Sequence, residues 1–418
     1  MPELPRLLRD FVPVAGVMKA DYTDFLVEEV PLYPADGAGT HTYFLLEKAG
    51  LSTHQAVGDI AHALNIRRHD IGFAGLKDAR AVTRQWMSVE HVAPEKLDAL
   101  NLPRMRVLQT TRHTNKLRLG HLRGNRFLIK IRQSDPARLA GLQDALAQLG
   151  RCGVPNYFGA QRFGYRGDTW RIGRATVRGE IDEAVNLILG RPTDDDHGAI
   201  RHARELFDRG LYAEAARAWP HLFRTERQAL KALVQRGGKL RRAFSAIDRT
   251  IRNFYVSAYQ SHLFNEVLAA RLPTGLGQLQ VGDLAWLHAS GAVFRVEDLA
   301  IDQPRAERFE ISPTGPLFGY RMSQPDGEPG RLEAEILARE GLTLETFRAH
   351  PLRIKGGRRS LRFRPGEPEL ALGADERGPY LALQFALPRG CYATALLREL
   401  FQLQEPADAL AEEEAGED

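Results

Sequence analysis

The sequence of 418 residues predicts an α+β protein in which a sheet-rich domain, built from both ends of the chain, is interrupted by a mainly helical insertion. Alternating apolar and polar residues, which are typical of strands, recur as far as residue 132. Helical spacing of apolar residues dominates between about residues 182 and 272. Short strand patterns return at 361–363 and 380–386, and strands this short need a sheet to join.

These patterns set the predicted domain boundaries. We place the sheet-rich domain at 1–181 and 351–404, and the insertion at 182–350. Residues 405–418 contain several Asp and Glu but no Lys or Arg, and we expect this acidic tail to be disordered.

The sheet-rich part carries three strand patterns and two helix patterns before the insertion. Ser52 and Gln55 resemble a capping box that starts a helix, because each side chain can bond the backbone N–H of the other residue. The strands are expected at Thr42–Lys48, Gln85–Val89 and Arg126–Arg132, and a second helix over Arg138–Leu149 precedes the loop Gly153–Gly167.

Helical periodicity predicts the elements of the insertion. The strongest pattern runs from about residue 252 to 272, and weaker ones cover 182–189, 201–218 and 226–235. The remaining stretch, 273–350, is expected to form β-hairpins and turns followed by a polar helix at 331–340, and a last helix is expected at Ala393–Phe401.

Composition narrows the class of protein. With 43% hydrophobic and 26% charged residues, the chain is expected to be soluble, and it contains no apolar run long enough to cross a membrane. Its first residues lack the apolar core of a signal peptide, so we expect a cytoplasmic location. Cys152 and Cys391 are too few for a disulfide framework or an all-cysteine zinc site.

Two basic runs point to nucleic acid. Residues 104–132 and 353–364 contain many Arg and Lys and no Asp or Glu, although the formal net charge of the whole chain is only +4. A phosphate chain is the natural counterpart of such surfaces. The alternative is a solvated face that acidic residues balance elsewhere in the fold.

A glycine-punctuated turn at 72–80 places one carboxylate, Asp78, close in sequence to Lys77, Arg80 and Arg84. Cations near a carboxylate favour its ionised form, which suits a nucleophile or an electrostatic stabiliser. A surface ion pair is the alternative. Glycosidases normally use two carboxylates, and the single acid of this turn disfavours that class.

A second loop, Val154–Gly164, combines aromatic, amide and arginine side chains, including Asn156 and Phe158. Amides bond base edges and aromatic rings stack on bases, but a packed loop with aromatics in the core is equally compatible. Asp194–His197 is expected to form a solvated turn rather than a metal site. The sequence also lacks a P-loop, an HExxH motif, a G-x-S-x-G motif and a dinucleotide fingerprint after a strand.

Taken together, these segments closely resemble the tRNA pseudouridine synthase D (TruD) family. Six matching motifs occur in the family's order and span nearly the whole chain: KADYTDFLVEE at 19–29, GFAGLKDARAVTRQW at 72–86, NKLRLGHLRGNRF at 115–127, VPNYFGAQRFG at 154–164, SAYQSHLFNEVLAARL at 257–272 and LPRGCYATALLREL at 387–400. The resemblance implies a pseudouridine-synthase catalytic core with a mixed or antiparallel sheet, interrupted by a TRUD insertion domain. It implies an isomerase that converts a uridine of tRNA, typically uridine-13, to pseudouridine.

The resemblance also implies roles for individual residues. Asp78 matches the catalytic aspartate, Lys19 the basic residue of the pocket, and Phe25, Asn156 and Phe158 the other pocket residues. We further expect Lys77, Arg80 and Tyr392 to bind the substrate, although Tyr392 stands where the family motif has phenylalanine, and Arg118, Arg123 and Arg126 to contact the RNA backbone.

The implied reaction neither gains nor loses atoms, so we expect no cofactor and no metal. The expected partner is tRNA, with no membrane contact, and the expected state is a monomer. A non-catalytic RNA-binding protein on the same scaffold is disfavoured because Asp78 is present. A different RNA substrate, such as ribosomal RNA, stays open.

Overall fold

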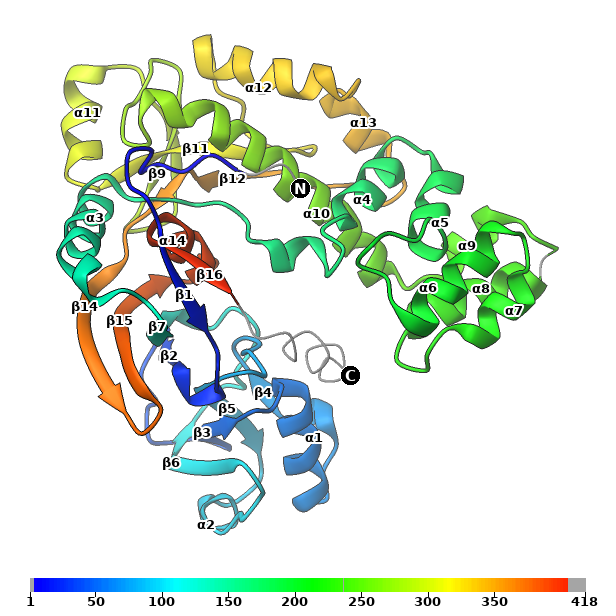
Figure 1. The fold of residues 1–418 in the computed structure, drawn as a ribbon, viewed down its shortest axis with the longest axis horizontal. Coiled ribbons are helices and arrows are strands. Elements are labelled where there is room, and N and C mark those ends of the chain that lie inside the picture. Colours follow the sequence, from blue (N-terminus) through cyan, green and yellow to red (C-terminus); the bar gives the residue numbers. More distant parts are fainter. Residues whose placement is uncertain (1–3, 236, 405–418) are drawn as a thin grey trace. The chain divides into compact units, whose positions relative to one another are not determined.

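The computed structural model describes residues 4–235 and 237–404 of an α+β chain (Figure 1). The acidic tail that we expected to be disordered lies outside the described residues. The chain forms two compact units. The sheet unit comprises Leu8–Val154 and the chain from Phe363 on, and the inserted unit comprises Pro155–Arg362 together with the residues up to Leu7.

The sheet unit is built on one mixed sheet with the strand order β14-β15-β7-β2-β5-β3-β6, to which β1, β4 and β16 attach at its side. Two pairs, β2 with β5 and β1 with β16, are parallel, and the other pairs are antiparallel. Its strands are β1 (Val14–Met18), β2 (Phe25–Pro31), β3 (His41–Ala49), β4 (Gly72–Phe73), β5 (Val82–Glu90), β6 (Met105–His113), β7 (Leu122–Arg132), β14 (Gly366–Asp375), β15 (Gly378–Pro388) and β16 (Phe401–Gln404).

Four helices accompany this sheet: α1 (Thr53–Ala63), α2 (Pro94–Asp98), α3 (Leu139–Cys152) and α14 (Ala393–Leu400). The predicted capping box starts α1, with Gln55 N donating to Ser52 Oγ and Ser52 N donating to Gln55 Oε1. The apolar face of α1, including Ile60, packs on Phe44 of β3 and Met87 of β5 in one buried cluster. This packing fixes α1 on the sheet beside the turn that carries Asp78.

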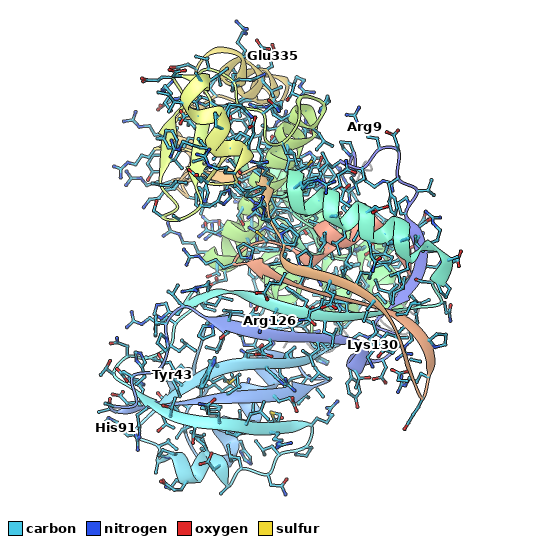
Figure 2. The ribbon with its side chains drawn as sticks, turned by 90° about the vertical axis from the view of Figure 1, so that its left-hand side faces the viewer. Arg9, Tyr43, His91, Arg126, Lys130 and Glu335 are labelled. Atoms are coloured by element: carbon cyan, nitrogen blue, oxygen red, sulfur yellow. The ribbon has the colours of Figure 1, made fainter. Side chains whose placement is uncertain are left out.

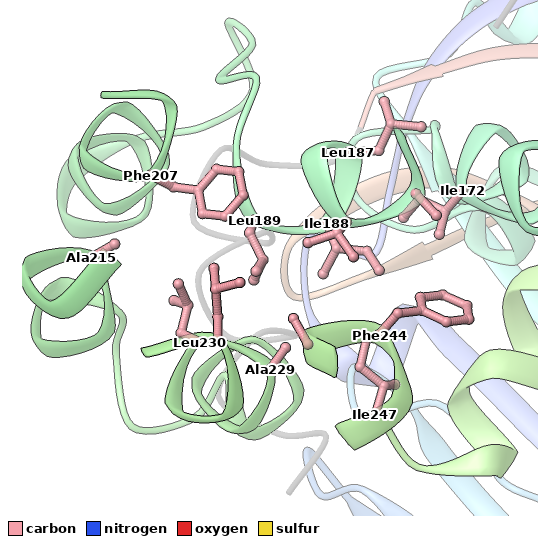
Figure 3. Packing of buried hydrophobic residues seen from close by; sticks show 14 of the residues in the cluster. Ile172, Leu187, Ile188, Leu189, Phe207, Ala215, Ala229, Leu230, Phe244 and Ile247 are labelled. Carbon is pink, nitrogen blue, oxygen red and sulfur yellow. The ribbon is translucent and has the colours of Figure 1, made fainter. Parts of the chain in front are cut away.

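The inserted unit begins with seven helices: α4 (Thr169–Val177), α5 (Ile181–Leu189), α6 (Gly198–Asp208), α7 (Tyr212–Ala218), α8 (Arg224–Gln235), α9 (Leu240–Ala246) and α10 (Arg249–Arg271). Their apolar faces share one buried core, to which Phe207, Leu230 and Phe244 belong (Figure 3). None of the helices in 4–235 and 237–404 is both long and apolar enough to cross a membrane.

The rest of the inserted unit is a small sheet in the order β10-β9-β11-β12 with helices around it. The strands are β9 (Leu284–Leu287), β10 (Val293–Arg295), β11 (Ile311–Leu317) and β12 (Gly357–Ser360), and the helices are α11 (Leu299–Glu307), α12 (Gly327–Arg339) and α13 (Leu344–Ala349). The chain passes between the units within two short strands, β8 (Val154–Pro155) and β13 (Arg362–Phe363).

Most predicted elements are present, and the differences are of three kinds. The helix predicted at 201–218 is two helices, because Gly210 adopts φ +77° and ends α6. Helix α11 lies where only hairpins and turns were expected. Helices α2, α4, α9 and α13 and strands β6 and β14 are among the elements that were not predicted.

The predicted domain boundaries at 181/182 and 350/351 differ from the boundaries of the compact units at 154/155 and 362/363. Helix α4 explains most of the first difference. Its Gly173 packs so closely on α10 that an added Cβ would lie 2.0 Å from the Tyr255 carbonyl oxygen. Helix α4 therefore belongs to the inserted unit.

Candidate active site

Asp78 lies in the turn between β4 and β5 of the sheet unit, with its side chain 35% exposed. A carboxylate with this exposure is accessible to a ligand and partly shielded from water. The main chain of the turn is anchored from β3, because Lys48 Nζ donates to the Asp78 carbonyl oxygen at 3.0 Å and also to the Leu51 carbonyl oxygen.

Lys19 is the cation nearest to the Asp78 carboxylate. Its Nζ lies 3.9 Å from Asp78 Oδ2, although the lysine side chain is only 4% exposed. The same ammonium lies over the ring of buried Phe25, 4.9 Å from the ring centroid. Lys19 directly follows β1 and adopts a left-handed φ of 55°, a conformation that costs a non-glycine residue about 1–3 kcal/mol. The ammonium is thus held in a fixed place beside the carboxylate.

Arg80 joins this group through the backbone. Its Nη2 donates to the Lys19 carbonyl oxygen at 3.1 Å, which ties the turn of Asp78 to the end of β1. Its Nη1 is buried and has no hydrogen-bond partner within 4–235 and 237–404. The structure therefore brings together four predicted site residues: Lys19, Phe25, Asp78 and Arg80.

Lys48 was missed by the sequence analysis. It lies on β3 and is fully buried, and burial lowers its pKa to about 8, although the Asp78 carboxylate acts in the opposite direction. The predicted strand Thr42–Lys48 ended at this lysine, so the pattern gave no sign that its ammonium is buried. Only the structure shows that its ammonium donates to the Leu51 and Asp78 carbonyl oxygens and thereby holds the turn.

Lys77 does not face the Asp78 carboxylate. Its Nζ lies 2.8 Å from Glu29 Oε2 in a buried ion pair, and burial raises the pKa of Glu29 while Lys77 opposes the rise. The Lys77 backbone N–H donates to Thr53 Oγ1, whose hydroxyl donates to Gln85 Oε1. The expected substrate contact of Lys77 has no support in this geometry, and the residue holds the turn from inside.

Arg84 also has a different partner from the one its sequence position suggested. Its Nε lies 2.8 Å from Glu47 Oε2 and its Nη1 lies 3.7 Å from Glu28 Oε2, on the strands next to β5. The expected cluster of Lys77, Arg80 and Arg84 around Asp78 is therefore wrong. Side chains alternate along a strand, and sequence proximity alone did not show which of them face the turn.

Tyr392 belongs to the sheet unit and is half-buried at the start of α14. Asn156 and Phe158 belong to the inserted unit and form a second cluster with Arg359. Asn156 Oδ1 accepts from Arg359 Nη2 at 2.5 Å, and Asn156 Nδ2 donates to the Ser360 carbonyl oxygen. Both polar atoms of this amide have partners, which favours a role in supporting the turn.

The ring of Phe158 is packed within the same cluster. The Arg359 guanidinium lies over it at 4.2 Å from the centroid, and Phe264 meets it edge-on at 5.5 Å. The Phe158 backbone bonds the Asn265 side chain in both directions. Phe158 is 8% exposed, so the position of its ring is set by the packing of the inserted unit.

Half of the basic run at 353–364 is internal, which corrects the expectation that the whole run forms a phosphate-binding surface. Arg358 forms a buried ion pair with Glu333, and Arg362 is buried with Nε donating to Ser312 Oγ. Arg359 stacks on Phe158. Arg353, Lys355 and Arg364 are the exposed members.

The run at 104–132 divides in two. Arg132 and Lys130 of β7 pair with Asp24 and Asp375 at 2.6 and 2.8 Å. Arg118, Arg123 and Arg126 are exposed, and Arg126 Nη2 lies 3.9 Å from Glu367 Oε2. Figure 2 labels Arg126 and Lys130 along β7. The three predicted backbone-contacting arginines are therefore available at the surface.

Comparisons with known proteins point to one family. The sequence profile described as "tRNA pseudouridine synthase D (TruD)" matches residues 5–400. The chain is 47% identical to the tRNA pseudouridine synthase D of Geobacter metallireducens, over 93% of this chain and 95% of that protein. It is 41% identical to the one of Syntrophotalea carbinolica, over 93% and 96% of the two chains.

A solved structure supports the same assignment. The crystal structure of a Methanosarcina mazei protein, presented as a candidate tRNA pseudouridine synthase D, aligns with a TM-score of 0.81 at 26% identity, over 95% of each chain. Profile, relatives and fold agree over nearly the whole length. This chain therefore belongs to the tRNA pseudouridine synthase D (TruD) family.

Proposed function

We propose that this protein is an isomerase that converts a uridine of tRNA, at position 13, to pseudouridine, with Asp78 as its catalytic residue. Membership of the TruD family supports the reaction and the class of substrate. The observation that carries the assignment of Asp78 is its accessible carboxylate beside the fixed ammonium of Lys19. The exposed arginines Arg118, Arg123 and Arg126 supply a surface for the RNA backbone.

The chemistry needs an anion next to the ribose. The C1′–N1 bond breaks, the uracil turns, and a C1′–C5 bond forms, while C5 loses a proton and N1 gains one. An ionised Asp78 can attack C1′, attack the base, or assist elimination of the base and then receive it. Each route requires the charged carboxylate, which Lys19 stabilises. No electron is exchanged with a second reactant, so we expect the reaction to proceed without a redox cofactor.

The target uridine must leave its base stack to reach this carboxylate, at a cost of a few kcal/mol. Lys19 then positions the Asp78 carboxylate through its ammonium. Arg80 acts indirectly, because its guanidinium donates to the Lys19 carbonyl oxygen. The Phe25 ring contacts the Lys19 ammonium through its face. Contacts of Tyr392, Asn156 and Phe158 with the uridine stay predictions.

The first test replaces the acid without changing its shape. Asp78→Asn should reduce pseudouridine formation in a tRNA transcript below detection, because the amide carries no negative charge, while tRNA binding stays within a few-fold. Asp59→Asn, an exposed residue of α1, is the matched control and should keep full activity. Full activity of Asp78→Asn would refute the assignment.

The second test identifies the substrate in cells. Pseudouridine is mapped in all RNAs of a strain that lacks the protein, with and without complementation by the wild-type gene. The expected result is the loss and recovery of pseudouridine at position 13 of tRNA. Loss confined to ribosomal RNA would keep the reaction and change the substrate.

A further inference from the structure

The sheet unit contains a pocket of about 530 Å³ that none of the predicted catalytic contacts uses. Its walls come from the segment after β2 and from the end of β6 with the loop that follows. They are formed by Tyr33, Pro34, His113, Asn115, Lys116, Arg118 and His121. Of these residues, Arg118 was expected to contact the RNA backbone, and Lys116 belongs to the basic run at 104–132. The volume is within the range of small-ligand sites.

The aromatic rings of this pocket are held in a fixed arrangement. His113 stacks on Tyr43 with ring centroids 4.7 Å apart, and Tyr33 packs against the same imidazole at 5.2 Å. Tyr33 Oη and His121 Nδ1 share a hydrogen bond of 2.8 Å. Tyr43 is labelled in Figure 2 near the end of the sheet that also carries His91. A half-exposed tyrosine ring backed in this way is a rigid platform.

Hydrogen bonds fix which nitrogen of His113 carries its proton. The Asn115 backbone N–H donates to His113 Nδ1 at 2.9 Å, and Tyr43 Oη donates to the Asn115 carbonyl oxygen. Because Nδ1 accepts, the proton of the imidazole lies on Nε2, which makes that nitrogen a donor. His113 is only 6% exposed, so this donor belongs to the wall of the pocket.

The charge of the pocket is positive. Lys116 and Arg118 line it, and neither forms an ion pair in the part of the chain that the structure describes. Lys116 Nζ donates to the His69 carbonyl oxygen, which leaves two of its protons for another acceptor. Asp36 lies near the rim, where its carboxylate accepts from Ala38 N and Thr114 Oγ1. The cationic groups of this pocket suit an anion, and its imidazole and phenol rings suit a planar ring. A ligand that joins an anion to a planar ring would therefore fit both.

We propose that this pocket binds one unpaired nucleotide of the RNA substrate, with its base on Tyr33 and its phosphate on Arg118 and Lys116. Stacking on aromatic rings and contacts to phosphate are how proteins hold single-stranded RNA. The proposal rests on the proposed function, since it assumes that RNA is the substrate.

This nucleotide is distinct from the uridine that reacts. Tyr43 and Lys48 lie five residues apart on β3, which is on the order of 17 Å along a strand. Tyr43 contacts the pocket, whereas Lys48 holds the turn of Asp78. A nucleotide in the pocket therefore lies several positions away from the target in the RNA chain. The pocket would set how the RNA is aligned on the sheet unit.

The test measures the affinity of a tRNA transcript for the Asp78→Asn protein, with and without changes in the pocket. Tyr33→Ala should weaken binding by roughly 5- to 100-fold, because one base loses its stacking partner. Tyr33→Phe keeps the ring and should restore binding to within about threefold, since it loses one hydrogen bond. Arg118→Ala should also weaken binding, whereas Arg106→Ala, an exposed arginine on β6 outside the pocket, should have a smaller effect.

A photoreactive nucleotide in the transcript adds a positional readout, and its crosslink should map by mass spectrometry to residues 113–121. Unchanged affinity of Tyr33→Ala, or equal losses for Arg118→Ala and Arg106→Ala, would overturn the proposal while leaving the proposed function intact. If the Asp78→Asn protein with an intact pocket binds no tRNA, the proposed function itself fails. Thermal unfolding of each variant separates loss of binding from loss of fold.

Discussion

Lys48 shows how one buried charge serves the candidate site. Its ammonium has no exposed surface, yet it donates to the Asp78 and Leu51 carbonyl oxygens. Burial favours the neutral amine, which is why the pKa falls to about 8. The residue holds the turn of Asp78 in place at a cost to stability at neutral pH.

A measurable pH effect follows from this cost. Between pH 8 and 10.5, the folded protein has released the Lys48 proton while the unfolded chain still binds it, so stability rises with pH through this window. Compared with Lys48→Met, the wild type should gain about 2 kcal/mol in unfolding free energy between pH 7.5 and 9.5. Denaturant unfolding of both proteins at the two pH values measures this difference. Parallel pH profiles would show that Lys48 titrates normally in the fold.

The Glu29–Lys77 pair makes a second prediction. Glu29→Gln should destabilise the protein by about 3–5 kcal/mol, because the Lys77 ammonium is left buried without its counter-charge. The double variant Glu29→Gln with Lys77→Met should recover part of that loss. Urea unfolding of the two single variants and the double variant gives the coupling energy. A double variant that is as unstable as the sum of both singles would exclude this pairing.

At this scale, the sequence located the turn but not its contacts. The resemblance pointed to Asp78 and Lys19, and the structure places their charged groups 3.9 Å apart. The sequence could not show the partners of Lys77, Arg84 or Lys48, because the partner of a side chain depends on which strand lies beside it. Glu29 and Glu47, the partners of Lys77 and Arg84, lie on strands far away in sequence.

Helix α4 depends on a single glycine for its packing. The Gly173 Cα lies against the backbone of α10, with no room for a methyl group beside the Tyr255 carbonyl oxygen. Gly173→Ala should destabilise the inserted unit by about 1–3 kcal/mol, because the two helices must move apart. Gly141→Ala in α3 is the control, since nothing lies within 4 Å of its added Cβ, and it should stabilise by roughly 0.5–1 kcal/mol. Denaturant unfolding of both variants decides the matter, and a neutral Gly173→Ala would contradict the close packing.

Elements with strong periodicity or a clear cap were predictable, and those whose pattern is interrupted were not. Helix α1 begins at the predicted capping box, and the strand predicted from Thr42 became β3. Helix α11 contains Pro304, which weakens a helical pattern, and β6 places polar residues on both faces. The turn at Asp194–His197 is present, but Asp196 is buried and accepts from Tyr165 and Thr193. The sequence did not show that one of these acids enters the fold.

For the whole molecule, the surface charge determines how RNA binding responds to salt. Replacing Arg118, Arg123 and Arg126 with glutamine should weaken tRNA binding and lower the slope of log Kd against log salt by roughly 2–3, at about 0.7–0.9 per lost phosphate contact. The control replaces Arg308, Arg331 and Arg348, each of which is already paired with a glutamate. Filter binding at several salt concentrations measures both slopes. Equal slopes for the two triple variants would show that these three arginines do not contact RNA.

The pairing of β7 with β15 has a consequence for biosynthesis. β7 is finished early, but its partner β15 leaves the ribosome only after the entire inserted unit has been translated. Until then the nascent chain exposes an edge of unpaired amide and carbonyl groups, which invites association with neighbouring chains. Chains that stall during translation of the inserted unit would keep this edge unpaired. The rate of translation across residues 155–362 therefore determines how long β7 remains without β15.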